Sequence, residues 1–142
     1  MDFRLTEEQR LIRRQMRELC AEFGDDYWRE HDREGTFPWA FFEAFADGGW
    51  CGITVPEEYG GEGYGVQEAA LVQGEVARSG AAMAGTSVTS HHVFSVAPLI
   101  EYGSPDHRER YLPRVADGDV MVCTGVTEPN AGTDTSRIGT TA

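Results

Sequence analysis

The feature that most constrains this chain is a polar run near its end, Gly125-Val126-Thr127-Glu128-Pro129-Asn130-Ala131-Gly132-Thr133-Asp134. The apolar residues 120–126 before it predict a short β-strand, and its glycines and proline predict a tight turn that leaves this strand. Thr127 and Thr133 offer hydroxyls, and Gly132 lets a ligand approach backbone N–H groups, as an anionic group requires. Turns of this kind also occur without a ligand, so the run alone leaves both interpretations open.

The position of this run also bears on domain organisation, because only eight residues follow Asp134. A binding site needs walls and rigid support, and a single edge strand cannot form a sheet. We therefore expect residues 1–118 to form a helical domain and residues 119–142 to begin a β domain that the chain leaves incomplete. On this expectation the chain is the front part of a larger protein and contributes half of a site.

Helical periodicity dominates the first 118 residues. A capping box at Thr6–Gln9 opens a helix that should run to at least residue 23 and as far as about 33. Further helices are predicted over roughly 38–47, 66–78, 81–102 with a kink at Pro98, and 105–113. Between them, residues 53–55 predict a short buried extended segment and the glycines at 60–65 a rigid turn.

The charge balance excludes two classes of partner. The chain has 24 acids against 12 bases, a formal net charge of −12, and every base is arginine. Such a surface repels nucleic acid phosphates and anionic membrane surfaces, so we expect neither partner. Adaptation to high salt and the codon bias of a GC-rich genome both explain a lysine-free acidic surface, and both stay open.

Cysteine and histidine placement argues against a metal site. Cys20, Cys51 and Cys123 are widely spaced and form no CxxC pair, which predicts free thiols. His91 and His92 are adjacent, so on a helix they would point about 100° apart and could not bind one metal together. The N-terminus lacks the apolar region of a signal peptide, and no apolar stretch has membrane-spanning length. We therefore expect a cytoplasmic protein.

Four segments, in order, resemble the acyl-CoA dehydrogenase family. They are Leu5–Gln9, Gly52–Gly61, Tyr102–Pro113 and Gly125–Asp134, and the last is similar to the family's flavin-binding signature with Thr133 in place of serine. The resemblance spans all 142 residues. It implies a mainly α chain, comprising the family's N-terminal helical domain and the first strand of a truncated β domain.

The resemblance implies an activity as well. The family binds FAD and oxidises an acyl-CoA thioester between Cα and Cβ, as part of fatty acid metabolism. A glutamate of its C-terminal domain removes the α-proton, so no catalytic residue is assigned here and the chain alone is expected to be inactive. The usual electron acceptor is electron-transferring flavoprotein, and the usual assembly is a homotetramer.

The resemblance assigns five cofactor-binding positions, Thr124, Val126, Thr127, Gly132 and Thr133. Val126 and Thr127 match positions that contact the flavin ring. Thr124 matches a position beside the flavin that an aromatic residue often holds. Gly132 and Thr133 match the turn near the FAD pyrophosphate and the pantetheine arm of CoA.

The substrate positions implied by the resemblance are Thr133, Thr86 and Ser90. The helix residues from Thr86 to Ser90 match the lining of the acyl pocket, and their small polar side chains would allow a roomy or polar pocket. Arg137 departs from the signature, which prefers a small residue there.

Two alternatives stay open. An acyl-CoA oxidase or a related flavoenzyme would share the fold and react with oxygen instead. A non-catalytic helical fragment or interaction module would use the helices without any chemistry.

Overall fold

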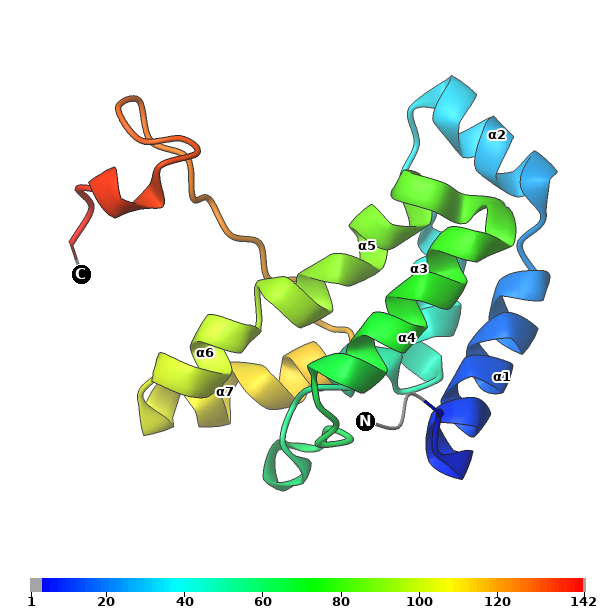
Figure 1. The fold of residues 1–142 in the computed structure, drawn as a ribbon, viewed down its shortest axis with the longest axis horizontal. Helices are drawn as coiled ribbons and strands as arrows, with labels where there is room; N and C mark the ends of the chain where they lie inside the picture. Colours follow the sequence, from blue (N-terminus) through cyan, green and yellow to red (C-terminus); the bar gives the residue numbers. More distant parts are fainter. Residues whose placement is uncertain (1–3, 142) are drawn as a thin grey trace.

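The computed structural model describes residues 4–141 and is mainly helical, as predicted (Figure 1). The α-helices are α1 (Glu7–Ala21), α2 (Asp25–Glu34), α3 (Trp39–Asp47), α4 (Val66–Val76), α5 (Ala82–Phe94), α6 (Ala97–Tyr102) and α7 (Pro105–Ala116). Short 3₁₀ turns cover Trp50–Gly52, Glu57–Tyr59 and Thr135–Arg137, and a π turn covers Ala77–Ala81. No described helix is long and apolar enough to cross a membrane.

Helix α1 begins where the sequence predicts. Thr6 Oγ1 accepts the N–H of Gln9, and Gln9 Oε1 accepts the N–H of Thr6, both at 3.1 Å. The helix ends at Ala21, however, and the extended backbone of Gly24 caps a second helix that opens with Asp25 and Asp26. The predicted extension to residue 33 was wrong because these acids stabilise a new helix N-terminus.

Helices α1 and α4 lie side by side and are joined by an ionic cluster around Glu75 (Figure 1). Glu75 is 4% exposed, and Arg17 donates two hydrogen bonds of 2.7 and 2.9 Å to its carboxylate. Arg13 donates to the same carboxylate, and Arg78 Nη2 lies 3.2 Å from it. The hydrogen bond from Arg17 contributes most to lowering the pKa of Glu75 to about 2, although burial opposes it.

Two apolar clusters fill the body. The larger lies among α1 to α5 and includes Met16, Trp28, Phe41, Phe45, Ile53 and Val76. The smaller lies beside α7 and contains Val55, Val96, Leu112, Val115 and Ala116. Cys20, Cys51 and Cys123 are free thiols, as the sequence predicts, and the structure buries the first two and exposes the third.

The segment after α3 folds differently from the prediction. Residues 53–55 form turns rather than an extended segment. The chain then turns back on itself, because Gly63 N donates to Val55 O at 2.9 Å and Tyr64 N donates to Ile53 O at 2.9 Å. At Gly61 a Cβ would lie 2.1 Å from the carbonyl oxygen of Val55, so only glycine fits the closed turn.

Three helix boundaries also differ from the predictions. Helix α4 passes directly into the π turn, where Gly80 has a φ of +103°. The predicted kink at Pro98 falls earlier, at residues 95–96, because proline fits the first turn of α6. Helix α7 opens with Ser104 as N-cap, as predicted, but continues through Pro113 to Ala116.

The predicted strand over residues 120–126 does not form. Val120 and Val122 pack against the smaller apolar cluster, and Val120 N donates to Arg114 O at 3.1 Å. The described chain has no second strand to pair with this segment, and its only bridge joins Glu128 to Ala131. Residues after 122 therefore leave the helical body as an arm, seen in orange and red in Figure 1.

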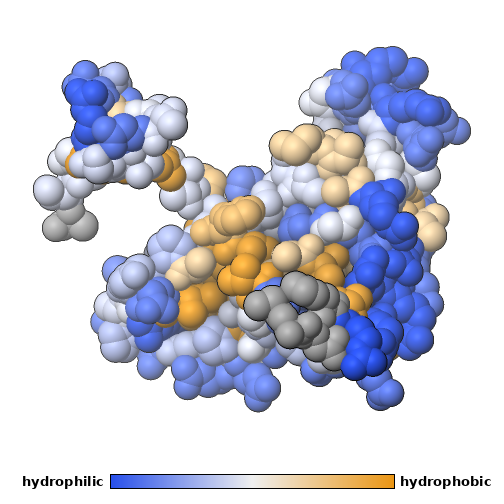
Figure 2. Space-filling view, in the orientation of Figure 1, coloured by the Kyte–Doolittle hydropathy of each residue, from blue (hydrophilic) through white to orange (hydrophobic). Residues whose placement is uncertain are grey.

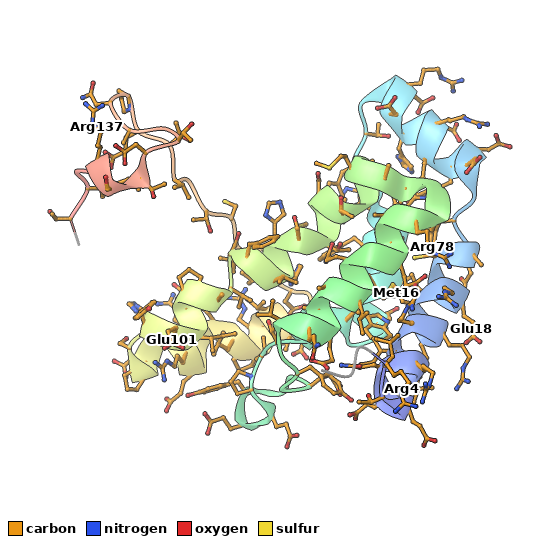
Figure 3. The ribbon with its side chains drawn as sticks, in the orientation of Figure 1. Arg4, Met16, Glu18, Arg78, Glu101 and Arg137 are labelled. Atoms are coloured by element: carbon orange, nitrogen blue, oxygen red, sulfur yellow. The ribbon has the colours of Figure 1, made fainter. Side chains whose placement is uncertain are left out.

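The Glu75 cluster predicts a stability effect. We expect Glu75→Gln to lower the free energy of unfolding at pH 7 by about 2–4 kcal/mol, because it removes charge-assisted hydrogen bonds from a buried site. Chemical denaturation measures the change. The matched control is Glu18→Gln, since Glu18 is an exposed carboxylate on α1 (Figure 3).

The same cluster fixes the acid limb of the stability curve. The pKa of Glu75 is lowered in the folded state, so its contribution is complete above about pH 4.5 and is lost as the pH falls toward 2. Glu75→Gln should flatten this limb. An unchanged acid limb would show that Glu75 does not stabilise the fold through its charge.

Candidate functional site

One face of α5 forms the wall of an apolar groove. Met83, Ser87, Ser90 and Phe94 recur at helical spacing and therefore share this face. Helix α4 supplies the opposite wall, and the complete lining is Val66, Ala70, Gln73, Met83, Thr86, Ser87, Ser90, Val93 and Phe94. This hollow of 430 Å³ contains both predicted substrate residues of the helical domain.

A second hollow of 510 Å³ continues the first toward α6. The two share Val66, Val93 and Phe94, and the second adds Ala97, Pro98, Ile100 and Tyr102 among others. We call the two hollows together the α4–α5 groove. Figure 2 shows apolar residues gathered on this face of the molecule, where Val66 and Phe94 are 76% and 74% exposed.

The groove is roomy, and two of its polar residues, Thr86 and Ser90, direct their hydroxyls back to their own helix. Thr86 Oγ1 donates to Ala82 O at 2.9 Å, and Ser90 Oγ donates to Ser87 O at 3.5 Å. A hydroxyl that bonds to its own helix offers its carbon atoms to the groove and has little capacity left for a ligand. Of the two possibilities in the sequence, the structure favours a roomy apolar groove over a polar one.

His92 lies behind the groove in the core. It is 1% exposed, its ring lies 5.7 Å from that of Phe42, and neither ring nitrogen has a hydrogen-bond partner of normal geometry in the described chain. Burial, with a smaller effect of His91, lowers the pKa of His92 to about 4, and the nearby backbone of Cys51 opposes this only in part. His92 is thus a buried core histidine.

Metal ligation finds no support within residues 4–141, where no three His, Cys, Asp or Glu side chains converge. A hollow of 730 Å³ between α1 and α3 contains none of the predicted site residues. Five carboxylates line it, from Glu8, Glu18, Glu22, Asp47 and Glu62. Because like charges repel, this hollow is unsuited to a phosphate-bearing ligand.

The five predicted cofactor residues lie on the arm. Thr124, Val126, Thr127, Gly132 and Thr133 are all exposed, and no hollow described above includes them. The arm stands apart from α5 (Figure 1), so the structure does not bring these five residues to Thr86 and Ser90.

The turn at residues 128–131, directly before Gly132 and Thr133, is closed on itself. Glu128 and Ala131 exchange backbone hydrogen bonds of 2.9 and 3.2 Å. The Glu128 carboxylate also accepts the N–H groups of Gly139 and Thr140, both at 2.9 Å. The sequence analysis missed this role, although the signal was available as an acid between Thr127 and Pro129.

Comparison with known proteins places the chain in a family. Residues 6–119 match the model of the acyl-CoA dehydrogenase N-terminal domain. This match covers most of the chain, which therefore belongs to the acyl-CoA dehydrogenase family and corresponds to the N-terminal portion of such proteins. The predicted family and fold class are confirmed.

Individual relatives match this chain over nearly its whole length in sequence and in structure. Acryloyl-CoA reductase (NADH) of Anaerotignum propionicum is 35% identical over 142 residues, which are 100% of this chain and 36% of the relative. The chain also superimposes on glutaryl-CoA dehydrogenase in its glutaryl-CoA complex, with a TM-score of 0.83, 27% identity and coverage of 97% of this chain and 35% of that one.

A third match comes from structural work on the electron transferring flavoprotein of Acidaminococcus fermentans. It has a TM-score of 0.85 and 31% identity, and covers 96% of this chain and 36% of that one. In all three comparisons the chain spans little more than a third of its relative's length.

The buried imidazole of His92 predicts a second pH effect. The pKa of His92 is lowered from 6.5 to about 4 in the folded chain. Between these two pH values the unfolded chain therefore binds a proton at His92 and the folded chain does not. Stability should therefore fall as the pH drops from 6.5 to 4, by about 3 kcal/mol at most. His92→Phe should remove this slope in denaturation curves.

The exposed His107 on α7 provides the control, because His107→Phe removes an imidazole that is already in water. An unchanged slope in His92→Phe would mean that another group causes the pH dependence.

Proposed function

We propose that this chain forms part of an FAD-dependent acyl-CoA dehydrogenase that oxidises an acyl-CoA thioester between Cα and Cβ. The observation that carries the proposal is the α4–α5 groove, an apolar channel lined by Thr86 and Ser90 on a fold shared with glutaryl-CoA dehydrogenase in its glutaryl-CoA complex. An apolar groove beside small side chains suits an acyl chain, because burial of methylene groups supplies the affinity.

The proposal divides the chain by task. Residues 1–118 form the helical domain and hold the acyl chain, while residues 119–142 begin the β domain and contribute to the flavin site. Within that site, Thr124, Val126 and Thr127 lie along the flavin ring, and Gly132 with Thr133 faces the pyrophosphate. Thr133 also contacts the pantetheine arm of CoA. Bound FAD would supply the hydride acceptor.

The exposure of the five arm residues supports this assignment. Between residues 4 and 141, the backbone N–H groups of Gly132, Thr133 and Asp134 meet no acceptor, so they are free to bind an anionic group. The hollow that contains Thr86 and Ser90 has no carboxylate in its lining, and Glu101 lines only the second hollow toward α6. The proposal accordingly assigns the catalytic base to another part of the enzyme.

We also propose an assembly, an electron acceptor and a cellular location for the enzyme. We infer a homotetramer that passes electrons to an electron-transferring flavoprotein, with the third structural comparison in support. The net charge of −12 supports the absence of nucleic acid and membrane partners. Three free cysteines suit the reducing cytoplasm and a role in fatty acid metabolism there.

Flavin binding tests the cofactor site. In the complete acyl-CoA dehydrogenase polypeptide that the proposal requires, Thr127→Ala and Thr133→Ala should each weaken FAD binding about tenfold, the effect of one lost hydrogen bond to a charged or polar ligand. Fluorescence titration of the apoprotein measures the dissociation constant. Thr135→Ala, a neighbouring exposed threonine outside the five positions, is the control. Unchanged affinity in both variants would overturn the assignment.

Substrate selectivity tests the groove. Ser90→Leu adds bulk to the α5 wall and should raise the KM for a longer acyl-CoA at least about tenfold, with less effect on a short one, since overpacking excludes chain atoms. Ala84→Leu on the exposed side of α5 is the matched control. Equal changes for both substrates would show that the acyl chain lies elsewhere.

A further inference from the structure

We propose that Glu128 is a positioning residue: it closes the loop from residue 128 to residue 140 and so holds Gly132 and Thr133 in their binding conformation without touching the ligand itself. This inference rests on the proposed function. Glu128 lies outside the five cofactor positions, and its carboxylate accepts hydrogen bonds from two residues of the arm.

Glu128 closes a loop of the chain through both its backbone and its side chain. Its backbone pairs with Ala131, which forms the tight turn at residues 128–131. Its carboxylate reaches further and accepts the N–H of Gly139 and both the N–H and the hydroxyl of Thr140. One side chain therefore joins the two ends of the segment from residue 128 to residue 140.

Both carboxylate oxygens of Glu128 are occupied. Oε2 accepts from Gly139 and Oε1 accepts from Thr140. These bonds lower the pKa of Glu128, that from the Gly139 N–H most of all, so the side chain remains the charged acceptor that the amides require. A carboxylate with both oxygens engaged would also repel a pyrophosphate at close range, which favours a supporting role over a ligand-binding one.

Among residues 4–141, the other hydrogen bonds of the loop that Glu128 closes are local. Asp134 accepts from the N–H of Ser136 at 3.3 Å and opens the turn Thr135–Arg137. Ala131 is 3% exposed and lies inside the loop, whereas Gly132 and Thr133 face outward. Arg137 lies on the same loop (Figure 3), but no ion pair joins it to Glu128 within residues 4–141.

The position of residues 132–134 within the loop explains why the contacts of the Glu128 carboxylate matter. Residues 132–134 lie between the two points that Glu128 connects, so their backbone N–H groups are oriented by the closed loop rather than by packing on the helical body. Without the carboxylate, the segment after Ala131 would lose its attachment to the turn. A flavin would then have to order the loop as it binds, which lowers affinity.

The loop is tested first without flavin, in the 142-residue chain. Solvent exchange of the Gly139 and Thr140 amides, followed by NMR, should be at least about tenfold faster in Glu128→Gln, because an amide oxygen is a weaker acceptor than a carboxylate. Glu128→Asp keeps the charge on a shorter side chain and should give intermediate rates. Glu109→Gln makes the same change of charge at an exposed position on α7 and should leave both rates unchanged.

The positioning role is tested next by FAD affinity in the complete polypeptide. We expect Glu128→Gln to raise the dissociation constant about tenfold, Glu128→Asp to recover part of it, and Glu109→Gln to match the wild type. Wild-type affinity in Glu128→Gln would overturn the positioning role and leave the proposed function standing. A wild-type protein that binds no FAD would overturn both, and unchanged amide exchange in Glu128→Gln would overturn the loop closure itself.

Discussion

The buried charge of Glu75 is the constraint on which the helical body depends. A carboxylate in the interior is costly unless several donors compensate it, and here three guanidinium groups do so from α1 and from the turn after α4. The cluster therefore fixes α1 against α4. Helix α4 also supplies one wall of the α4–α5 groove. The Glu75 cluster therefore helps to determine the shape of this groove.

The connection between α4 and α5 transmits this constraint. The π turn at Ala77–Ala81 joins the helices directly, and Arg78 of that turn bonds to the Glu75 cluster. Ala82 is held at a φ of +45°, which is strained for a residue with a Cβ, and such strain persists only where the surroundings over-determine it. The sharp change of direction returns α5 alongside α4 (Figure 1), with Thr86 and Ser90 toward the groove.

The sequence predicted those parts of the fold that depend on local chemistry. The Thr6–Gln9 capping box and the Ser104 cap could be identified because side chain and backbone are neighbours in the chain. The turns at residues 53–55 and the π turn could not, since they depend on tertiary packing and on hydrogen bonds such as Tyr64 to Ile53. The strand at 120–126 was predicted from its own residues, but a strand exists only with a partner.

The candidate site shows the same division between local and distant information. A motif identified the arm residues, yet its acid Glu128 was overlooked because its partners lie eleven and twelve positions away. For the groove, the resemblance implied that Thr86 and Ser90 line an acyl pocket, but it left open whether that pocket is polar, because their bonds to their own helix cannot be read from the motif. Body and arm are thus ordered separately, the first by a buried ionic cluster and the second by a carboxylate-closed loop. Val120 and Val122 attach the arm to the body, because they pack against the smaller apolar cluster beside α7.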